Sequence, residues 1–254
     1  MSNYEGDMKR YRMTYDIHTH TIFSHGKGTV EDNVKAALGK GLSTVGISDH
    51  GPGHIFYGIK RGNISLLRQE IERLKPLYPA IEILMGVEAN IINPSGRLDV
   101  YGAGINDFDY ILAGYHYGII GENPVRAAGI HLFNLMAEKF RTGGKVLKRT
   151  NTELVIKALY TNKIKVLTHP GDKGPFDLPE IARACGDTGT MMEISTWHEA
   201  PDTDELRRLA SADVRFIISS DAHSPHRVGT FVPGLKRAMA AGIDPERIDN
   251  VKEV

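Results

Sequence analysis

Nine residues with metal-ligating side chains lie at or just past the ends of seven apolar runs in this 254-residue chain. They are His18, His20, His25, His50, Glu88, His116, His169, Asp221 and His223. Neutral imidazole and carboxylate groups bind borderline divalent metals, and nine ligands are far too many for a single ion. Because the set contains no thiolate, it suits Zn, Mn or Fe, and the sequence does not choose among them. The pattern indicates a multinuclear metal centre of a hydrolase.

The spacing of several of these residues predicts that they share ions. Side chains alternate across a strand, so His18 and His20 point the same way and can reach one metal, and Asp221 and His223 repeat the spacing. A single H-x-H pair is a weak signal, but six of the seven runs end in a ligand-type residue. Only the sixth run, which carries Glu193, offers no clear ligand.

The apolar runs themselves predict seven β-strands, which alternate with helical patterns. The strands are expected over 14–20, 44–50, 81–90, 110–117, 165–170, 190–197 and 215–223, and the helices over 29–39, 63–78, 152–162, 178–186, 202–211 and 235–242. Strict alternation favours a parallel sheet with right-handed crossovers, and strand ends that meet at one point describe the active-site rim of a β/α barrel. Seven strands in place of eight predict a barrel that is irregular or incompletely closed. We therefore expect an α/β fold with a distorted seven-stranded, TIM-like barrel over residues 1–254 as a single domain.

A long connection interrupts this alternation over 118–150. It carries an amphipathic stretch and then a basic cluster that includes Arg141 and Lys148. Connections of this length in compact domains are usually functional, so a lid insertion over the site is one interpretation. A surface helix with a solvated basic flank is the other.

Composition limits the classes of partner. Lysine plus arginine equals aspartate plus glutamate, 31 each, which argues against a protein that coats nucleic acid. The single cysteine, Cys185, lies in a helical pattern and is predicted to be a buried core residue. Since no uncharged run reaches membrane-spanning length and no apolar leader opens the sequence, we expect a cytoplasmic protein without a membrane partner.

The order H-x-H, H, D-H, E, H, H-P and D-x-H resembles the PHP superfamily, named for polymerase and histidinol phosphatase. The phrases SDHGP, GVEANI and SDAHS are most similar to its small stand-alone bacterial phosphatases of the YcdX type. The resemblance runs from Asp16 to about Val228. It implies a distorted seven-stranded β/α barrel that holds three divalent metal ions, and relatives of this type can self-associate, so a homo-oligomer is possible.

The resemblance also divides the ligands among the three ions, with Glu88 as a bridge between the first two. The groups are His18, His20, Glu88 and Asp221 for the first metal, Glu88, His116 and His169 for the second, and His25, His50 and His223 for the third.

Such a centre predicts phosphate-ester hydrolysis, most simply of a small phosphomonoester. Ions about 3.5–4 Å apart can activate a hydroxide and hold phosphoryl oxygens. The alternatives are cleavage of a phosphodiester, as in nuclease members of the superfamily, hydrolysis of a carbon–nitrogen bond, and a metal-stabilised module without catalysis. Histidinol phosphate, a nucleotide and a sugar phosphate all remain open as substrates.

Residues beyond the ligands are candidates for supporting roles. Arg227 is predicted to pair with phosphate oxygens, and His226, His198 or a metal-bound water to protonate the leaving group. Asp16 and Asp49 either orient imidazoles or cap turns. We therefore count Glu88, Asp221, Arg227 and His226 as the candidate catalytic residues.

Overall fold

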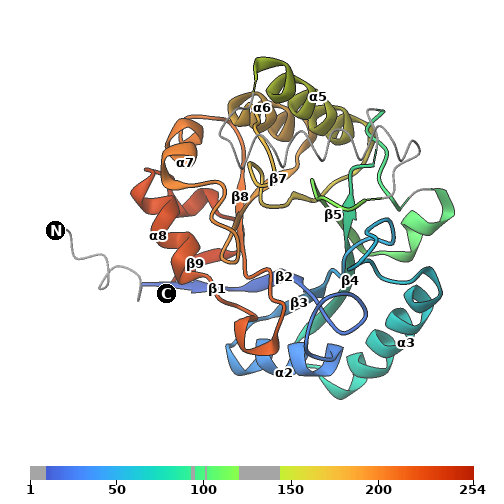
Figure 1. Cartoon of the computed structure of the whole chain (residues 1–254). Coiled ribbons are helices and arrows are strands. Elements are labelled where there is room, and N and C mark those ends of the chain that lie inside the picture. Colours follow the sequence, from blue (N-terminus) through green and yellow to red (C-terminus); the bar gives the residue numbers. More distant parts are fainter. Residues whose placement is uncertain (1–9, 93–94, 101, 120–143) are drawn as a thin grey trace.

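The computed structural model describes residues 10–92, 95–100, 102–119 and 144–254. Its centre is one sheet of seven parallel strands, whose spatial order is the order along the chain. The strands are β2 (Tyr15–Thr19), β3 (Thr44–Ile47), β4 (Glu82–Asn90), β5 (Tyr110–Gly114), β6 (Val166–Leu167), β7 (Met191–Ser195) and β8 (Phe216–Ser219). Figure 1 shows them as a ring with the helices outside. This arrangement confirms the predicted α/β barrel.

The ring closes where its first and last strands end. A parallel bridge joins Thr19 to Ala222, the His20 amide donates to the Ala222 carbonyl at 2.8 Å, and the Ala222 amide donates to the His18 carbonyl at 3.2 Å. The two strands share no longer ladder in the described residues. The barrel is therefore nearly closed, and its seam holds together next to predicted ligands.

Six α-helices of the described chain cover the outside of the sheet. They are α2 (Val30–Gly39), α3 (Ile64–Leu74), α5 (Lys145–Thr161), α6 (Leu178–Thr188), α7 (Thr203–Leu209) and α8 (Val232–Ala240). Short 3₁₀ turns stand at Arg61–Asn63, Lys75–Leu77, Gly102–Asp107, Pro225–Arg227 and Pro245–Arg247. Helix α2 begins with a capping box between Thr29 and Asp32, and α7 with another between Asp202 and Glu205. These caps satisfy amide groups that a helix start leaves unpaired.

The predicted strands and helices are present, and the structure differs from the prediction in two respects. Helix α5 begins at Lys145 where the sequence predicted a start at 152, because the lysines, leucine and arginine before that point are themselves good helix formers. A two-stranded antiparallel sheet, β1 (Tyr11–Met13) with β9 (Val251–Glu253), was not predicted. Its strands are too short for a periodic signal.

The segment 118–150, predicted as a possible lid, lies largely outside the described residues, which omit 120–143. At its far end, 145–150 belongs to helix α5. The lid stays a prediction. In the part of the chain that the structure describes, no helix combines the length and apolar character needed to cross a bilayer.

A small apolar layer fills the barrel interior below the strand ends. Ile17, Tyr110 and Leu112 belong to it, with Val166 and Ile217. The Tyr110 hydroxyl donates to the Ile17 carbonyl at 2.7 Å, so this ring reaches across the barrel from β5 to β2. The layer closes the bottom of the interior, and polar groups gather above it.

The Tyr110 ring fits because glycines face it on β3 and β4. A Cβ atom at Gly46 would lie 2.0 Å from the Tyr110 hydroxyl oxygen, and one at Gly86 would lie 2.2 Å from its ring. Real side chains do not tolerate such distances. Each glycine therefore leaves the space that the ring fills.

We predict that Gly46→Ala destabilises the fold by about 1–3 kcal/mol, the usual cost of overpacking a core. Gly39→Ala is the matched control, because a Cβ at that position in α2 would meet nothing within 4 Å. It should be neutral or slightly stabilising. Urea unfolding of both variants measures the difference, and equal midpoints would contradict the packing argument.

Candidate metal centre

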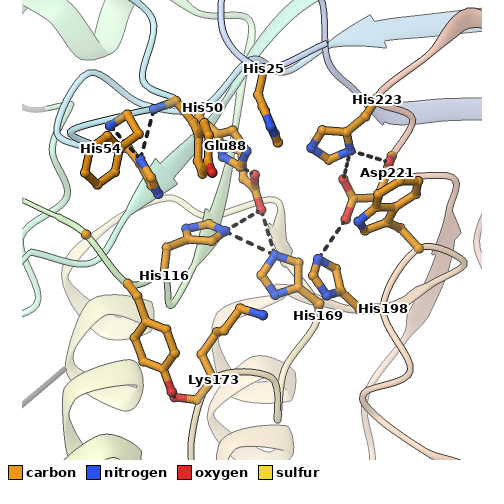
Figure 2. A pocket seen from close by; sticks show the side chains of 15 residues that line it. His25, His50, His54, Glu88, His116, His169, Lys173, His198, Asp221 and His223 are labelled. Carbon is orange, nitrogen blue, oxygen red and sulfur yellow. Dashed lines mark hydrogen bonds and ion pairs between the residues drawn. The ribbon is translucent and has the colours of Figure 1, made fainter. Parts of the chain in front are cut away.

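A cavity of about 430 Å³ opens at the carboxyl ends of the strands. Seven of the nine predicted ligands line it. The other two, His18 and His20, are fully buried against Glu88 and Asp221. Among the lining residues, Figure 2 shows His116 and His169 turned toward Glu88. It also shows His198 and His223 turned toward Asp221. Residues spread over two hundred positions of sequence therefore meet at one end of the barrel.

Glu88, on β4, is the centre of the cluster. Its Oε1 lies 2.9 Å from His169 Nε2 and 3.2 Å from His116 Nε2. Its Oε2 lies 2.8 Å from His50 Nδ1 and 3.4 Å from His18 Nε2. Since each oxygen faces a different pair of imidazoles, this carboxylate has the geometry of a bridge between two ions.

Asp221, just past β8, is the second carboxylate. Its Oδ1 lies 3.2 Å from His20 Nε2, 3.5 Å from His223 Nδ1 and 3.6 Å from His18 Nε2. Its Oδ2 faces His198 Nε2 at 3.4 Å. The predicted grouping of His18, His20 and Asp221 is therefore present in space.

Two of these residues have unusual backbones. Asp221 has φ +47° and His169 has φ +29°, in the left-handed region that side chains other than glycine rarely adopt. Such strain persists only where the surrounding structure imposes it, and it gathers at functional sites. Both residues aim their side chains at the same cluster.

An irregularity in β2 places His18 there. The pairing of β2 with β3 shifts register between Asp16 and Thr19. Ile17 belongs to the apolar layer inside the barrel, yet its neighbour His18 also reaches the interior carboxylates. A regular strand would send these two side chains to opposite faces. The bulge therefore changes the face of the strand at the point where chemistry begins.

Glu193, which the sequence analysis set aside, is a buried partner of this cluster. Its Oε1 accepts from His18 Nδ1 at 2.6 Å, and its Oε2 accepts from the His169 amide at 2.7 Å. Because the carboxylate holds the proton on Nδ1, Nε2 is the nitrogen of His18 that faces Glu88 and that would bind a cation. A carboxylate inside an otherwise apolar run was the signal that could have identified this residue.

Asn90 fixes His116 in a similar way. The Asn90 amide group donates to Asp99 Oδ2 at 2.6 Å, which leaves its Oδ1 as the acceptor for His116 Nδ1 at 2.7 Å. His116 Nε2 then carries a lone pair toward Glu88. Asn90 ends the strand that holds Glu88, so one strand supplies both the bridging carboxylate and this orienting amide.

Four buried ring nitrogens of the cluster form no hydrogen bond of good geometry among the described residues, although three of them lie 2.8–3.4 Å from a carboxylate oxygen. They are His18 Nε2, His20 Nδ1, His20 Nε2 and His50 Nδ1. Buried polar atoms without partners are rare and costly. Lone pairs that converge with two carboxylates are what divalent cations bind, so these residues fit a metal centre.

Burial and neighbouring groups shift the pKa values of three residues in the cluster. Burial opposes the charged form of His18, but three nearby carboxylates, led by Glu193, hold the pKa of its imidazole well above the usual value. Burial also opposes the Glu88 carboxylate, but surrounding imidazoles, led by His116, hold its pKa well below the usual value. Burial and neighbouring imidazoles lower the pKa of His20 strongly. The high pKa of His18 means that a proton occupies the nitrogen facing Glu88 in the metal-free site, and a cation would displace it.

Ligand atoms of the described residues gather into four groups, each within 4.8 Å. The groups are His20, His50 and His223; His18, His20 and Asp221; His50, Glu88 and His116; and His169, Asp172 and His198. His25 joins none of them: its ring stacks on Tyr57 at 4.0 Å and lies 5.0 Å from the His223 ring. It lines the cavity all the same.

The two aspartates that precede ligands act on backbone and hydroxyl groups. Asp16 accepts from the Ser220 hydroxyl and from the Gly229 amide, and Asp49 accepts from the Thr21 amide at 2.7 Å. Neither contacts an imidazole in the hydrogen bonds described, so the interpretation that they orient imidazoles is wrong and the turn-stabilising alternative holds. Their carboxylates fix the loops that follow β2 and β8.

The two remaining catalytic candidates lie off the cavity. Arg227 donates to the Thr196 carbonyl at 2.9 Å, and its guanidinium lies 4.8 Å from the Trp197 ring centre. The His226 ring is 3.5 Å from the Ser224 hydroxyl. Neither residue lines the cavity, whereas His198 does. Their predicted roles stay predictions.

Comparison with known proteins places the chain in a family. The PHP domain matches residues 16–196. A protein named probable phosphatase YcdX from Escherichia fergusonii is 27% identical over 252 residues, which cover 93% of this chain and 89% of that protein. A probable phosphatase from Citrobacter koseri is 28% identical, with the same coverage. Histidinol phosphate phosphatase of Lactococcus lactis, solved with zinc, L-histidinol and phosphate, superposes with a TM-score of 0.62 at 18% identity, over 91% of this chain and 95% of that one. The chain belongs to the PHP domain family.

Proposed function

We propose that the protein is a metal-dependent phosphatase that hydrolyses a small phosphomonoester at a trinuclear centre. One observation carries the proposal: imidazoles and two buried carboxylates converge beside an open cavity, and several of the ring nitrogens form no hydrogen bond among the described residues. Family membership and the names of the relatives, both probable phosphatases, support the same reaction class.

Three groups of residues would hold the ions. The first is His18, His20, Glu88 and Asp221; the second is Glu88, His116 and His169; the third is His25, His50 and His223. The distances around Glu88 and Asp221 support the first two. For the third, the ligand atoms of His50 and His223 gather together with His20, while the His25 ring stacks on Tyr57. Zinc, manganese and iron all suit this donor set.

Bound divalent ions supply an activated water at neutral pH and neutralise charge on the phosphoryl oxygens. The chain's own residues hold that arrangement still: Glu88 joins the two sides of the cluster, while Glu193 and Asn90 fix the ring orientations of His18 and His116. Preorganised charge of this kind is the usual source of catalysis in phosphoryl transfer.

The cavity indicates the size of the substrate. A volume of about 430 Å³ is in the range of small-molecule pockets. The relative from Lactococcus lactis was solved with L-histidinol and phosphate, which supports a small alcohol phosphate as the substrate class.

We predict that Glu193→Gln lowers affinity for the first metal by roughly 10–100-fold, the usual effect of losing a carboxylate behind a ligating imidazole. Metal content after dialysis against graded chelator, measured by plasma mass spectrometry, tests this. Glu82→Gln, at the opposite end of β4, is the control and should retain metal. Equal retention by both variants would show that Glu193 does not support a ligand.

Metal addition to chelator-treated protein should raise the melting temperature. A cation that binds only the folded state stabilises it by about 2.7 kcal/mol at one hundred times its dissociation constant. Calorimetric scans with zinc or manganese check this, with magnesium as the comparison ion because it prefers oxygen ligands. A melting temperature that zinc and manganese leave unchanged would contradict the proposed metal centre.

The reaction itself is tested with three substrates. The protein loaded with zinc or manganese should hydrolyse p-nitrophenyl phosphate in preference to bis-p-nitrophenyl phosphate and to a p-nitroanilide. His20→Ala and Glu88→Ala should lose turnover together with metal. Preference for the diester would favour the nuclease-type activity, and bound metal with no turnover would favour a module without catalysis.

A further inference from the structure

Lys173, in the loop between β6 and α6, presents a cation to the cavity. Among the described residues that line it, Lys173 is the only lysine or arginine. In Figure 2 its side chain rises from the wall toward His169 and His198. A positive charge therefore stands beside the imidazole and carboxylate cluster.

The backbone at Lys173 is one that glycine would adopt more easily. Its φ is +63°, in the left-handed region. The Tyr117 hydroxyl donates to the Lys173 carbonyl at 2.6 Å and ties this loop to the segment that follows β5. A long charged side chain at such a position carries a steric cost, which suggests that the side chain itself has a use.

Asp172 holds the ammonium in place. Its Oδ2 lies 2.9 Å from Lys173 Nζ and 3.1 Å from His198 Nδ1, so one carboxylate fixes two groups on the same wall. An ammonium group carries three N–H donors, so its contact with Asp172 leaves others free to donate.

The position of Lys173 beside Asp172 favours binding of an anion, and not of a fourth metal ion, on this side of the cavity. His169, Asp172 and His198 are spaced as metal ligands, but the lysine ammonium already lies against the aspartate oxygen. Arg227, predicted to contact phosphate, does not line the cavity: it donates to the Thr196 carbonyl and lies over the ring of Trp197, which does.

We propose that Lys173 binds non-bridging phosphate oxygens of the substrate, and that Asp172 is a positioning residue for Lys173 and His198. The proposal rests on the proposed phosphatase function and adds to it the residue that recognises the phosphate from outside the metal ligands.

Lys173→Met and Lys173→Gly test it in metal-loaded protein. Loss of one charge-assisted contact should weaken inorganic phosphate, measured by titration calorimetry, and raise KM for p-nitrophenyl phosphate, each by roughly tenfold or more. Metal content should not change. In Lys173→Gly the melting temperature should hold or rise while phosphate affinity falls, because glycine suits φ +63°. A purely structural lysine would not separate these two readouts.

Three further variants serve as controls for the role of Lys173. Lys165→Met, an exposed lysine at the other end of β6, should match wild type in every readout. Lys173→Arg should recover part of the phosphate affinity, and Asp172→Asn should lose part of it with metal content unchanged.

Unchanged phosphate affinity and KM in Lys173→Met would overturn the role of Lys173, as would a loss of phosphate affinity that follows a loss of metal. Titration calorimetry measures phosphate binding and does not depend on turnover. A wild type that binds phosphate through Lys173 but hydrolyses none of the three esters or amides would therefore count against the phosphatase function alone.

Discussion

The site is organised by an electrostatic imbalance at the open end of the barrel. Glu88 and Asp221 are almost completely buried, 1% and 2% exposed, yet the groups around them are imidazole nitrogens. Buried charge without compensation is expensive, and in the metal-free site protonated imidazoles such as His18 supply the compensation. Divalent cations would complete the arrangement because they bind carboxylate and imidazole at once.

The barrel makes this imbalance possible by keeping the interior in two layers. Below, Tyr110 crosses the interior and fills the space left by Gly46 and Gly86. Above, the strands end in carboxylates and imidazoles. The seam between β2 and β8 forms at Thr19 and Ala222, so the contact that closes the ring also sets the spacing of the ligands beside it.

The convergence of the predicted ligands was predictable because its signal is local and repeated. Strand alternation correctly placed His18 and His20 on the same side, and the strand ends revealed the rim. The bulge between Asp16 and Thr19 was not predictable, since its cause is the pairing with β3 and not the residues of β2. Glu193 was missed for a related reason: its partner His18 is 175 positions away, and only the closed barrel brings them together.

Arg227 shows what residue type alone leaves open. A guanidinium close in sequence to two ligands was a reasonable partner for phosphate, but the 3₁₀ turn Pro225–Arg227 directs it to Thr196 and Trp197. No pattern in the sequence distinguishes these outcomes, because the direction of a side chain after a turn depends on backbone angles and neighbours.

The contacts divide the site into a fixed part and a selective part. His18 and His116 are held through their second nitrogen by Glu193 and Asn90, so the direction of these two rings is set before any ligand arrives. Lys173, on a connecting loop, is held by an ion pair with its neighbour Asp172. A change in such a loop would therefore alter which phosphate ester is accepted while the predicted metal ligands keep their geometry, which is how one barrel serves different substrates.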